Sequence, residues 1–446
     1  MPSAAEQLAA NFNFGAFAKA TELRKRIWFT LGALIVYRLG TYIPLPGIDP
    51  IVISDVFARQ AGGILGMFNM FSGGALQRMT IFALNIMPYI SASIIIQLMT
   101  AVVPSLEAVK KEGEAGRKKL NQYTRYLTVL ITIGQAYGLA VGLEGMRSSV
   151  GSAVLDPGMF FRLTTVITLL GGTMFLMWLG EQITARGIGN GISLIIFAGI
   201  VAQFPHSVAA TLELGRTGAL STPAIIGLLL LIVAVVFFVV FVERAQRRII
   251  IQYPKRQVGM RITGGESSHL PLKINTSGVI PPIFASSLLL MPITLIGFMA
   301  GSGPAWLSTV SVYLGHGQPL YLLLYVGLII FFAFFYTAVV FNPAETADNL
   351  KKYGGFIPGI RPGKNTADYL DRVLTRLTVI GAVYLAIVCI LPEILISRLA
   401  IPFYFGGTSL LIVVTVTMDT VAQVQSHLLA HQYEGLIKKA KLKGRR

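Results

Sequence analysis

Residues 223–242 read PAIIGLLLLIVAVVFFVVFV, and residues 243–248 that follow read ERAQRR. A helix needs about 20 apolar residues to cross the hydrocarbon core of a bilayer, so the first stretch predicts a transmembrane helix. Basic residues beside a span resist translocation. The second stretch therefore predicts that the C-terminal end of this helix faces the cytoplasm.

Apolar stretches of this kind recur along the chain, whose residues are 54% hydrophobic and 13% charged. The mean hydropathy of +0.68 lies far above that of soluble domains. We therefore predict an all-α, polytopic integral membrane protein with ten transmembrane helices. The predicted spans are residues 27–44, 79–102, 126–143, 162–180, 187–205, 223–242, 274–298, 319–341, 377–392 and 408–426.

The basic residues fall almost entirely in alternate gaps between these spans. Because cytoplasmic loops carry an excess of Lys and Arg, this pattern predicts that both termini are cytoplasmic. The net charge of +17 also fits a docking surface for an acidic cytosolic partner, and both explanations can hold. Of the 37 Lys and Arg residues, 30 lie in residues 1–26, 103–125, 181–191, 243–273, 342–376 and 427–446.

Ten spans divide evenly into a first half at residues 27–205 and a second half at residues 206–426. A cytoplasmic N-terminal segment at residues 1–26 and a basic tail at residues 427–446 flank them. Because each half has an odd number of spans, duplicated halves must be inverted, which places a pathway at their interface. The spans hold almost no ionisable groups away from their ends, whereas an ion-coupled carrier needs them. A passive conduit is therefore favoured over a secondary transporter of small solutes.

Residues 62–75 (GGILGMFNMFSGGA) are apolar but about half as long as a span. They predict either a re-entrant element on the outer side or a helix on the membrane surface. Pro88 in the second span, and Pro281, Pro282 and Pro292 in the seventh, predict kinked or irregular helices.

Signatures of catalysis are missing from the sequence. Residues 187–191 (GIGNG) are not followed by the lysine of a phosphate-binding loop, and they predict a tight turn with Asn190 or Ser193 as a helix cap. His427 and His431 are four residues apart but lack the Glu of a zinc-protease helix. We therefore predict neither enzymatic activity nor a cofactor.

The loops at residues 243–273 and 342–376 are longer than a connection requires. In the first, residues 248–253 (RIIIQY) predict a strand. In the second, the prolines around Arg361 predict an extended tip that holds this arginine toward solvent. Rigid basic loops, together with the short segment 62–75, argue against a purely structural scaffold.

Five stretches carry a resemblance to a known family. They are FNMFSGG at residues 68–74, MPYISASI at 87–94, GEQI with GIGNG within 180–191, IRPG at 360–363 and PFYFGGTS at 402–409. In this order they resemble the SecY family, the central subunit of the bacterial protein-conducting channel. The resemblance runs from about residue 20 to the C-terminus.

The resemblance implies an hourglass pore between two inverted five-helix halves, with an apolar ring at its waist. A narrow apolar collar dewets and blocks ions, yet deforms around an extended chain. The proline-bearing second and seventh spans resemble a lateral gate toward lipid. By position, the ring residues are Ile86, Ile90, Ile192, Ile196, Ile283 and Ile412. The segment 62–75 resembles the plug of the family, with Gly62, Phe68, Asn69, Phe71, Gly73 and Gly74 as candidate plug residues.

The implied function is passage of unfolded secretory and membrane proteins across or into the lipid bilayer of the bacterial inner membrane. The implied partners are the SecE and SecG membrane subunits, the SecA motor ATPase and the ribosome. Arg361 matches the arginine of the family that is critical for the motor, whereas Met260-Arg261 stands where relatives often carry adjacent arginines. The candidate docking residues are Arg247, Arg248, Lys255, Arg256, Arg261 and Arg361.

Overall fold

A computed structural model describes residues 21–59, 69, 72–145, 147–148, 151–218, 221–253, 256–258, 261–263, 267–299, 313, 318–399 and 407–443. Every predicted span overlaps a helix, which confirms the all-α class and agrees with the ten-helix expectation. These helices are α3 (Thr21–Gly40), α6 (Met87–Val102), α8 (Glu114–Gly145), α9 (Met159–Arg186), α10 (Gly191–Arg216), α11 (Thr222–Arg244), α12 (Ile280–Met299), α14 (Pro319–Val340), α16 (Lys364–Leu399) and α17 (Gly407–Lys443).

Seven helices among the described residues are long and apolar enough to cross a membrane, or eight if α6 and α7 (Pro104–Lys111) form one span bent by 99°. The two helices that remain are α3, which opens with the charged run Glu22–Arg26, and α12, of which Ile280–Leu289 counts as a shorter apolar helix. α10 continues through Pro205 to Arg216, beyond the predicted end of the first half at residue 205.

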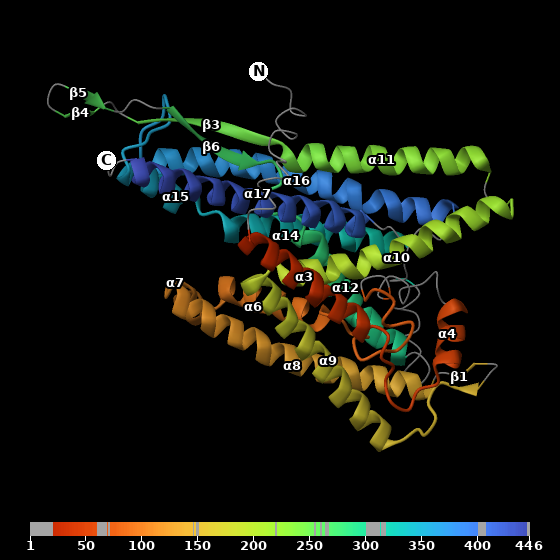
Figure 1. Cartoon of the computed structure of the whole chain (residues 1–446). Helices are drawn as coiled ribbons and strands as arrows, with labels where there is room; N and C mark the ends of the chain where they lie inside the picture. Colours follow the sequence, from red (N-terminus) through yellow and green to blue (C-terminus); the bar gives the residue numbers. More distant parts are fainter. Residues whose placement is uncertain are drawn as a thin grey trace.

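The helices form two groups with a third set between them (Figure 1). α6, α8 and α9 pack together in one group, and α14, α16 and α17 pack in the other, with α11 at its outer edge. α3, α10 and α12 lie between these groups. α12 contacts α6 and α8 as well as α14, so the seam between the two halves is closed in this structure.

The two ends of the molecule differ in their loops. The strands β3 (Gln246–Gln252) and β6 (Ser267–Lys273) pair antiparallel, and β4 (Arg256–Val258) pairs with β5 (Arg261–Thr263). This confirms the predicted strand at residues 248–253. The strands, α7 and α15 (Pro343–Lys352) lie at one end, and α4 (Pro50–Arg59), β1 (Arg147–Ser148) and β2 (Gly151–Ser152) lie toward the other (Figure 1).

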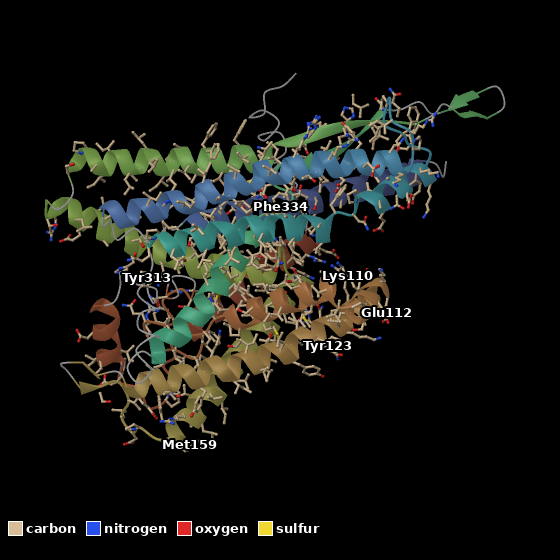
Figure 2. All side chains as sticks on the ribbon, turned by 180° about the vertical axis from the view of Figure 1, so that it is seen from behind. Lys110, Glu112, Tyr123, Met159, Tyr313 and Phe334 are labelled. Carbon is tan, nitrogen blue, oxygen red and sulfur yellow. The ribbon has the colours of Figure 1, made fainter. Side chains whose placement is uncertain are left out.

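Single side chains mark the same division. Lys110 and Glu112 lie at the end that carries the strands, whereas Met159 and Tyr313 lie at the opposite end (Figure 2). The first end is the one that the charge pattern assigns to the cytoplasm.

The predicted turn at residues 187–191 is confirmed, with Asn190 rather than Ser193 as the cap of α10. The Asn190 side chain accepts hydrogen bonds from the amides of Ile192 and Ser193 at 3.1 and 3.5 Å. Two of the first four amides of the helix, which lack partners within it, are thereby satisfied.

The predicted second span begins as a helix only at Met87, because residues 72–86 form a series of turns. Pro88 therefore lies in the first turn of α6, where its missing amide hydrogen costs nothing, and does not kink the helix. The turns run between α3 and α9, where the Phe82 ring stacks on Tyr37 and Phe175 with centroids 6.2 and 5.9 Å apart.

Two glycines make room for this segment. A Cβ atom at Gly40 of α3 would overlap the Phe82 ring, and one at Gly172 of α9 would overlap the Ile81 carbonyl oxygen. Because Ile81 and Phe82 stand just before Ile86, these close contacts fix where α6 starts.

We expect Gly172→Ala to destabilise the protein by about 1–3 kcal/mol, because the added methyl group meets a backbone oxygen that has little room to move. Gly171→Ala is the matched control, since a Cβ atom there meets nothing within 4 Å. It should be neutral or slightly stabilising. Thermal unfolding in detergent compares the two, and equal melting temperatures would contradict the proposed contact.

Candidate functional site

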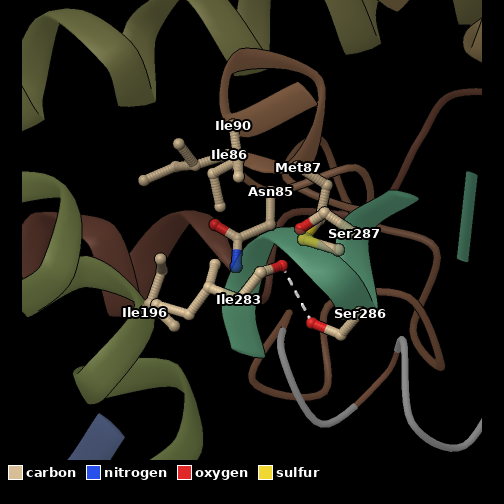
Figure 3. Close-up of a pocket in the computed structure, with 8 residues that line it drawn as sticks. All are labelled: Asn85, Ile86, Met87, Ile90, Ile196, Ile283, Ser286 and Ser287. Carbon is tan, nitrogen blue, oxygen red and sulfur yellow. Dashed lines mark hydrogen bonds between the residues drawn. The ribbon is translucent and has the colours of Figure 1, made fainter. Parts of the chain in front are cut away.

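Four of the six candidate ring residues meet around one pocket between the two halves (Figure 3). Ile86 precedes α6, Ile90 lies on α6, Ile196 lies on α10 and Ile283 lies on α12. The free volume of the pocket is about 10 Å³, which is about what a single water molecule needs. The other lining residues are Asn85, Met87, Ser286 and Ser287.

The remaining two candidate ring residues do not line this pocket. Ile412 of α17 is fully buried in the main hydrophobic core. Ile192, at the start of α10, lies against Gly180 of α9, where its Cγ1 would be 3.1 Å from a Cβ atom. Their place in the ring stays a prediction from the resemblance.

The pocket also has polar groups that the sequence reasoning missed. Ser286 Oγ donates to the Ile283 carbonyl oxygen at 3.0 Å, so this hydroxyl is satisfied by its own helix (Figure 3). Ser287 Oγ is buried without a hydrogen-bond partner among the described residues. Asn85 has a φ of +50°, a left-handed conformation that Asn tolerates better than most residues. In the sequence these polar residues lie inside the predicted spans 79–102 and 274–298, where no pattern singles them out.

The end of the candidate plug segment is anchored to two helices. Arg38 Nη1 of α3 donates to the Gly73 carbonyl oxygen at 3.0 Å, and the Tyr37 hydroxyl donates to the Ser72 carbonyl oxygen at 3.4 Å. Gly73 has a φ of +66°, and a Cβ atom there would lie 2.9 Å from the Cα of Gly199 in α10. A side chain at residue 73 is therefore excluded by both backbone strain and space.

A local turn precedes this anchor. Asn69 Oδ1 accepts from the Gln77 amide at 2.8 Å, and the Gly74 amide donates to the Asn69 carbonyl oxygen at 2.9 Å. Of the candidate plug residues, the structure describes Asn69, Gly73 and Gly74, while Gly62, Phe68 and Phe71 lie outside the described residues.

The two basic loops form one structural unit with the start of α16. The Gln252 amide donates to the Phe356 carbonyl oxygen at 2.9 Å, and the Phe356 amide returns a hydrogen bond at 3.0 Å. We call residues 246–252, 267–273 and 356–377 the loop unit. Its apolar core contains Ile249, Leu272, Ile357, Leu370, Val373, Leu374 and Leu377.

The loop unit presents Arg361 in a defined way. The Ile360 amide donates to the Ile357 carbonyl oxygen at 3.1 Å, and Gly359 has a φ of +82°, so the predicted extended tip is a tight turn. Thr366 Oγ1 then donates to the Arg361 carbonyl oxygen at 3.0 Å. The backbone of Arg361 is held on both sides, and its side chain is exposed, as predicted.

Three acidic residues at this end of the molecule pair with basic neighbours. Lys111 lies 2.7 Å from Glu107 and lowers the pKa of that carboxyl from its ordinary value, chiefly through a hydrogen bond. Arg125 Nη2 contacts both oxygens of Glu181 at 2.8 and 2.7 Å. Among the described residues, no such carboxylate pairs with Arg247, Arg248 or Arg361.

The structure describes some of the candidate docking residues more fully than others. Arg247 and Arg248 lie exposed on β3, and Arg361 follows the turn described above. Arg256 lies on β4 and Arg261 on β5, while Lys255 lies outside the described residues. In the described part of the chain, no three His, Cys, Asp or Glu side chains gather as a metal site would require.

The SecY family model matches residues 80–421. The chain belongs to the SecY family. It is 58% identical over 424 residues to the protein translocase subunit SecY of Escherichia coli (strain K12), which covers 95% of this chain and 96% of the relative. The SecY subunit of Rickettsia conorii is also 58% identical, over 422 residues, with 95% of this chain and 97% of the relative covered.

Solved structures share the fold at low sequence identity. A protein-conducting channel superposes with a TM-score of 0.65 and 18% identity, covering 91% of this chain and 92% of the other. Sec61 in a canine ribosome–channel complex superposes with a TM-score of 0.62 and 17% identity, at the same coverage. The fold is therefore that of a SecY-type channel in a multi-pass membrane protein.

We expect the double variant Ile86→Ser, Ile283→Ser to raise ion conductance of the resting protein in planar bilayers. Two hydroxyls in a pocket of this size favour water and remove the barrier to ions. The matched control is Leu163→Ser, Ile167→Ser on α9, where both side chains are exposed. An equal rise in conductance in both double variants, or no rise in either, would contradict the prediction that the pocket residues form the ring that blocks ions.

Proposed function

We propose that the chain is the pore-forming subunit of a protein translocase, which passes unfolded secretory proteins across the membrane and releases transmembrane segments into lipid. The observation that carries this proposal is the convergence of Ile86, Ile90, Ile196 and Ile283 from both halves of the molecule. The names of the bacterial relatives support it.

The chemistry of the pocket fits a polypeptide of varied sequence better than a fixed ligand. Branched apolar side chains offer no hydrogen bonds, so they seal the resting channel without holding a passing chain. A transporter of small solutes needs placed polar or charged groups near the midplane. The polar lining here is limited to Asn85, Ser286 and Ser287, which supports the channel over the transporter.

A lateral exit follows from the position of α12. This helix carries Ile283 and also closes the seam against α6 and α8. Movement of α12 away from α6 would widen the ring and open the seam toward lipid in one step. We propose that α6 and α12 are the lateral gate, and that residues 62–75 are the plug.

The translocase would draw its energy from partners and act as a conduit, not as an enzyme. We propose that the SecA motor ATPase and the ribosome dock on the loop unit and on β4 and β5. In the loop unit, Arg247, Arg248 and Arg361 are exposed and have no carboxylate partner among the described residues. Structures of canine and yeast relatives are described as ribosome complexes. SecE and SecG would cover apolar helix faces within the membrane, such as that of α11.

The orientation proposed here places both termini and the loop unit in the cytoplasm and the protein in the bacterial inner membrane. It rests on the distribution of basic residues among the loops. The proposal is tested by reconstitution into vesicles, with and without motor and a presecretory protein. ATP-dependent protection of that substrate from external protease is the expected result, and its absence with an active motor would contradict the proposal.

We expect Arg361→Glu to reduce ATP-driven uptake about tenfold or more, because hydrogen bonds to charged groups contribute about 1.5–3 kcal/mol. Arg361→Lys should retain part of the uptake, since lysine keeps the charge but loses bidentate geometry. Arg117→Glu, exposed on α8 and outside the loop unit, is the control and should behave as the unmodified protein. Melting temperatures should be similar in all three, because exposed charges contribute little to folding. Uptake by the Arg361→Glu variant near the normal rate would show that Arg361 is a solvated loop residue without a role in docking the motor.

A further inference from the structure

A buried carboxylate lies where the loop unit joins the membrane helices. Glu243, at the end of α11, has only 7% of its surface exposed. Its Oε1 accepts a hydrogen bond from Asn275 Nδ2 at 2.7 Å and one from the Tyr384 hydroxyl at 3.4 Å. Burying an ionisable group is costly, and such groups within spans commonly serve function more than packing.

Asn275 connects this carboxylate to the segment that leads into α12. Its Nδ2 also donates to the Gly278 carbonyl oxygen at 3.0 Å, and its Oδ1 accepts from Ser277 Oγ at 3.0 Å. Asn275 is 3% exposed, so these bonds form away from water. The amide therefore fixes the whole turn between β6 and α12.

Three separate elements meet at this point. Glu243 belongs to α11, Asn275 belongs to the turn before α12, and Tyr384 belongs to α16. A Cβ atom at Gly381 of α16 would lie 3.0 Å from the Ile274 carbonyl oxygen, so the turn and α16 are in close contact. The Ile274 amide also donates to the Ala245 carbonyl oxygen at 3.1 Å, which extends the β3–β6 ladder up to the cluster.

The chain then runs directly to the pore. β6 ends at Lys273, α12 begins at Ile280, and Ile283 in the first turn of α12 lines the pocket. Gly278 has a φ of +65° and is the one glycine between the cluster and α12. A displacement of the loop unit thus has a short covalent path to α12.

We infer that Glu243, Asn275 and Tyr384 form a joint that transmits partner docking on the loop unit to α12, and so opens the lateral seam. This inference rests on the proposed function. The three are positioning residues, since all three side chains are buried away from the surface and do not line the pocket. With the joint intact, α11, α16 and the turn move together; without it, docking displaces the loops and leaves α12 in place.

The test measures docking and opening separately in the full chain. Labels at Met99→Cys of α6 and Leu288→Cys of α12, both exposed side chains, report the width of the seam by a distance-sensitive spectroscopic signal. Cys389 is the single cysteine of the chain, and Cys389→Ala gives a background without competing thiols. Binding of the motor to vesicles gives the affinity of docking.

Asn275→Leu should bind the motor with unchanged affinity, yet the docking-induced distance change should fall about fivefold or more. Glu243→Gln, which keeps an oxygen to accept both hydrogen bonds, should preserve most of that change. Thr276→Val, at the neighbouring residue and outside the joint, should behave as the unmodified protein. Tyr384→Phe keeps the packing of the ring and should reduce the change by an intermediate amount.

Normal opening in both Asn275→Leu and Tyr384→Phe would overturn the joint. Tyr384→Phe decides the matter alone if Asn275→Leu does not fold. An equal loss of the distance change in Glu243→Gln and Asn275→Leu would also overturn the joint. The hydrogen bonds, which Glu243→Gln keeps, would then not be what couples docking to opening. Failure of the unmodified protein to open on docking would instead count against the proposed function, so the two failures are distinguishable.

Discussion

Contact between isoleucine side chains from opposite halves of the molecule is the interaction on which the rest of the structure depends. Ile86 and Ile90 come from one side of the pocket, and Ile196 and Ile283 approach from α10 and α12. The contact is apolar, so it excludes ions without a specific bond that a moving chain would have to break. The surrounding helices keep these isoleucines close together. At the same time α12 lies at the seam between the two halves, where we propose that it can move.

Close backbone contacts keep the ring residues of the first half in position. Gly40 and Gly172 admit residues 81 and 82 between α3 and α9, which sets the start of α6 and the position of Ile86. Arg38 and Tyr37 of α3 bind the carbonyl oxygens that end the candidate plug. The first half is therefore a firm frame for one side of the ring. The second half presents Ile283 on a helix whose base is tied to the loop unit by a few buried hydrogen bonds.

Much of this fold was predictable from the sequence, because hydropathy and charge act locally. The order and approximate positions of the spans, the strand at residues 248–253 and the Asn190 cap follow from composition and turn chemistry. The predicted start of α6 was wrong by eight residues. Residues 79–86 are apolar enough for a helix, but backbone hydrogen bonds to residues 43 and 45 and the close contacts with Gly40 and Gly172 hold them in turns. The hydrogen bond between Tyr384 and Glu243 could likewise not be predicted from the sequence, because partners 141 residues apart leave no periodic pattern. The ring residues came from the family resemblance, not from periodicity.

The central claim is that an extended polypeptide passes between these isoleucines, and site-specific cross-linking tests it most directly. A photoreactive residue replaces Ile196 at the pocket or, as a control, Ile167 on the exposed face of α9. A presecretory chain arrested halfway through the membrane should cross-link to the residue at position 196 and not to the one at 167. A chain that cross-links only at position 167, or equally at both, would contradict a pathway through the pocket.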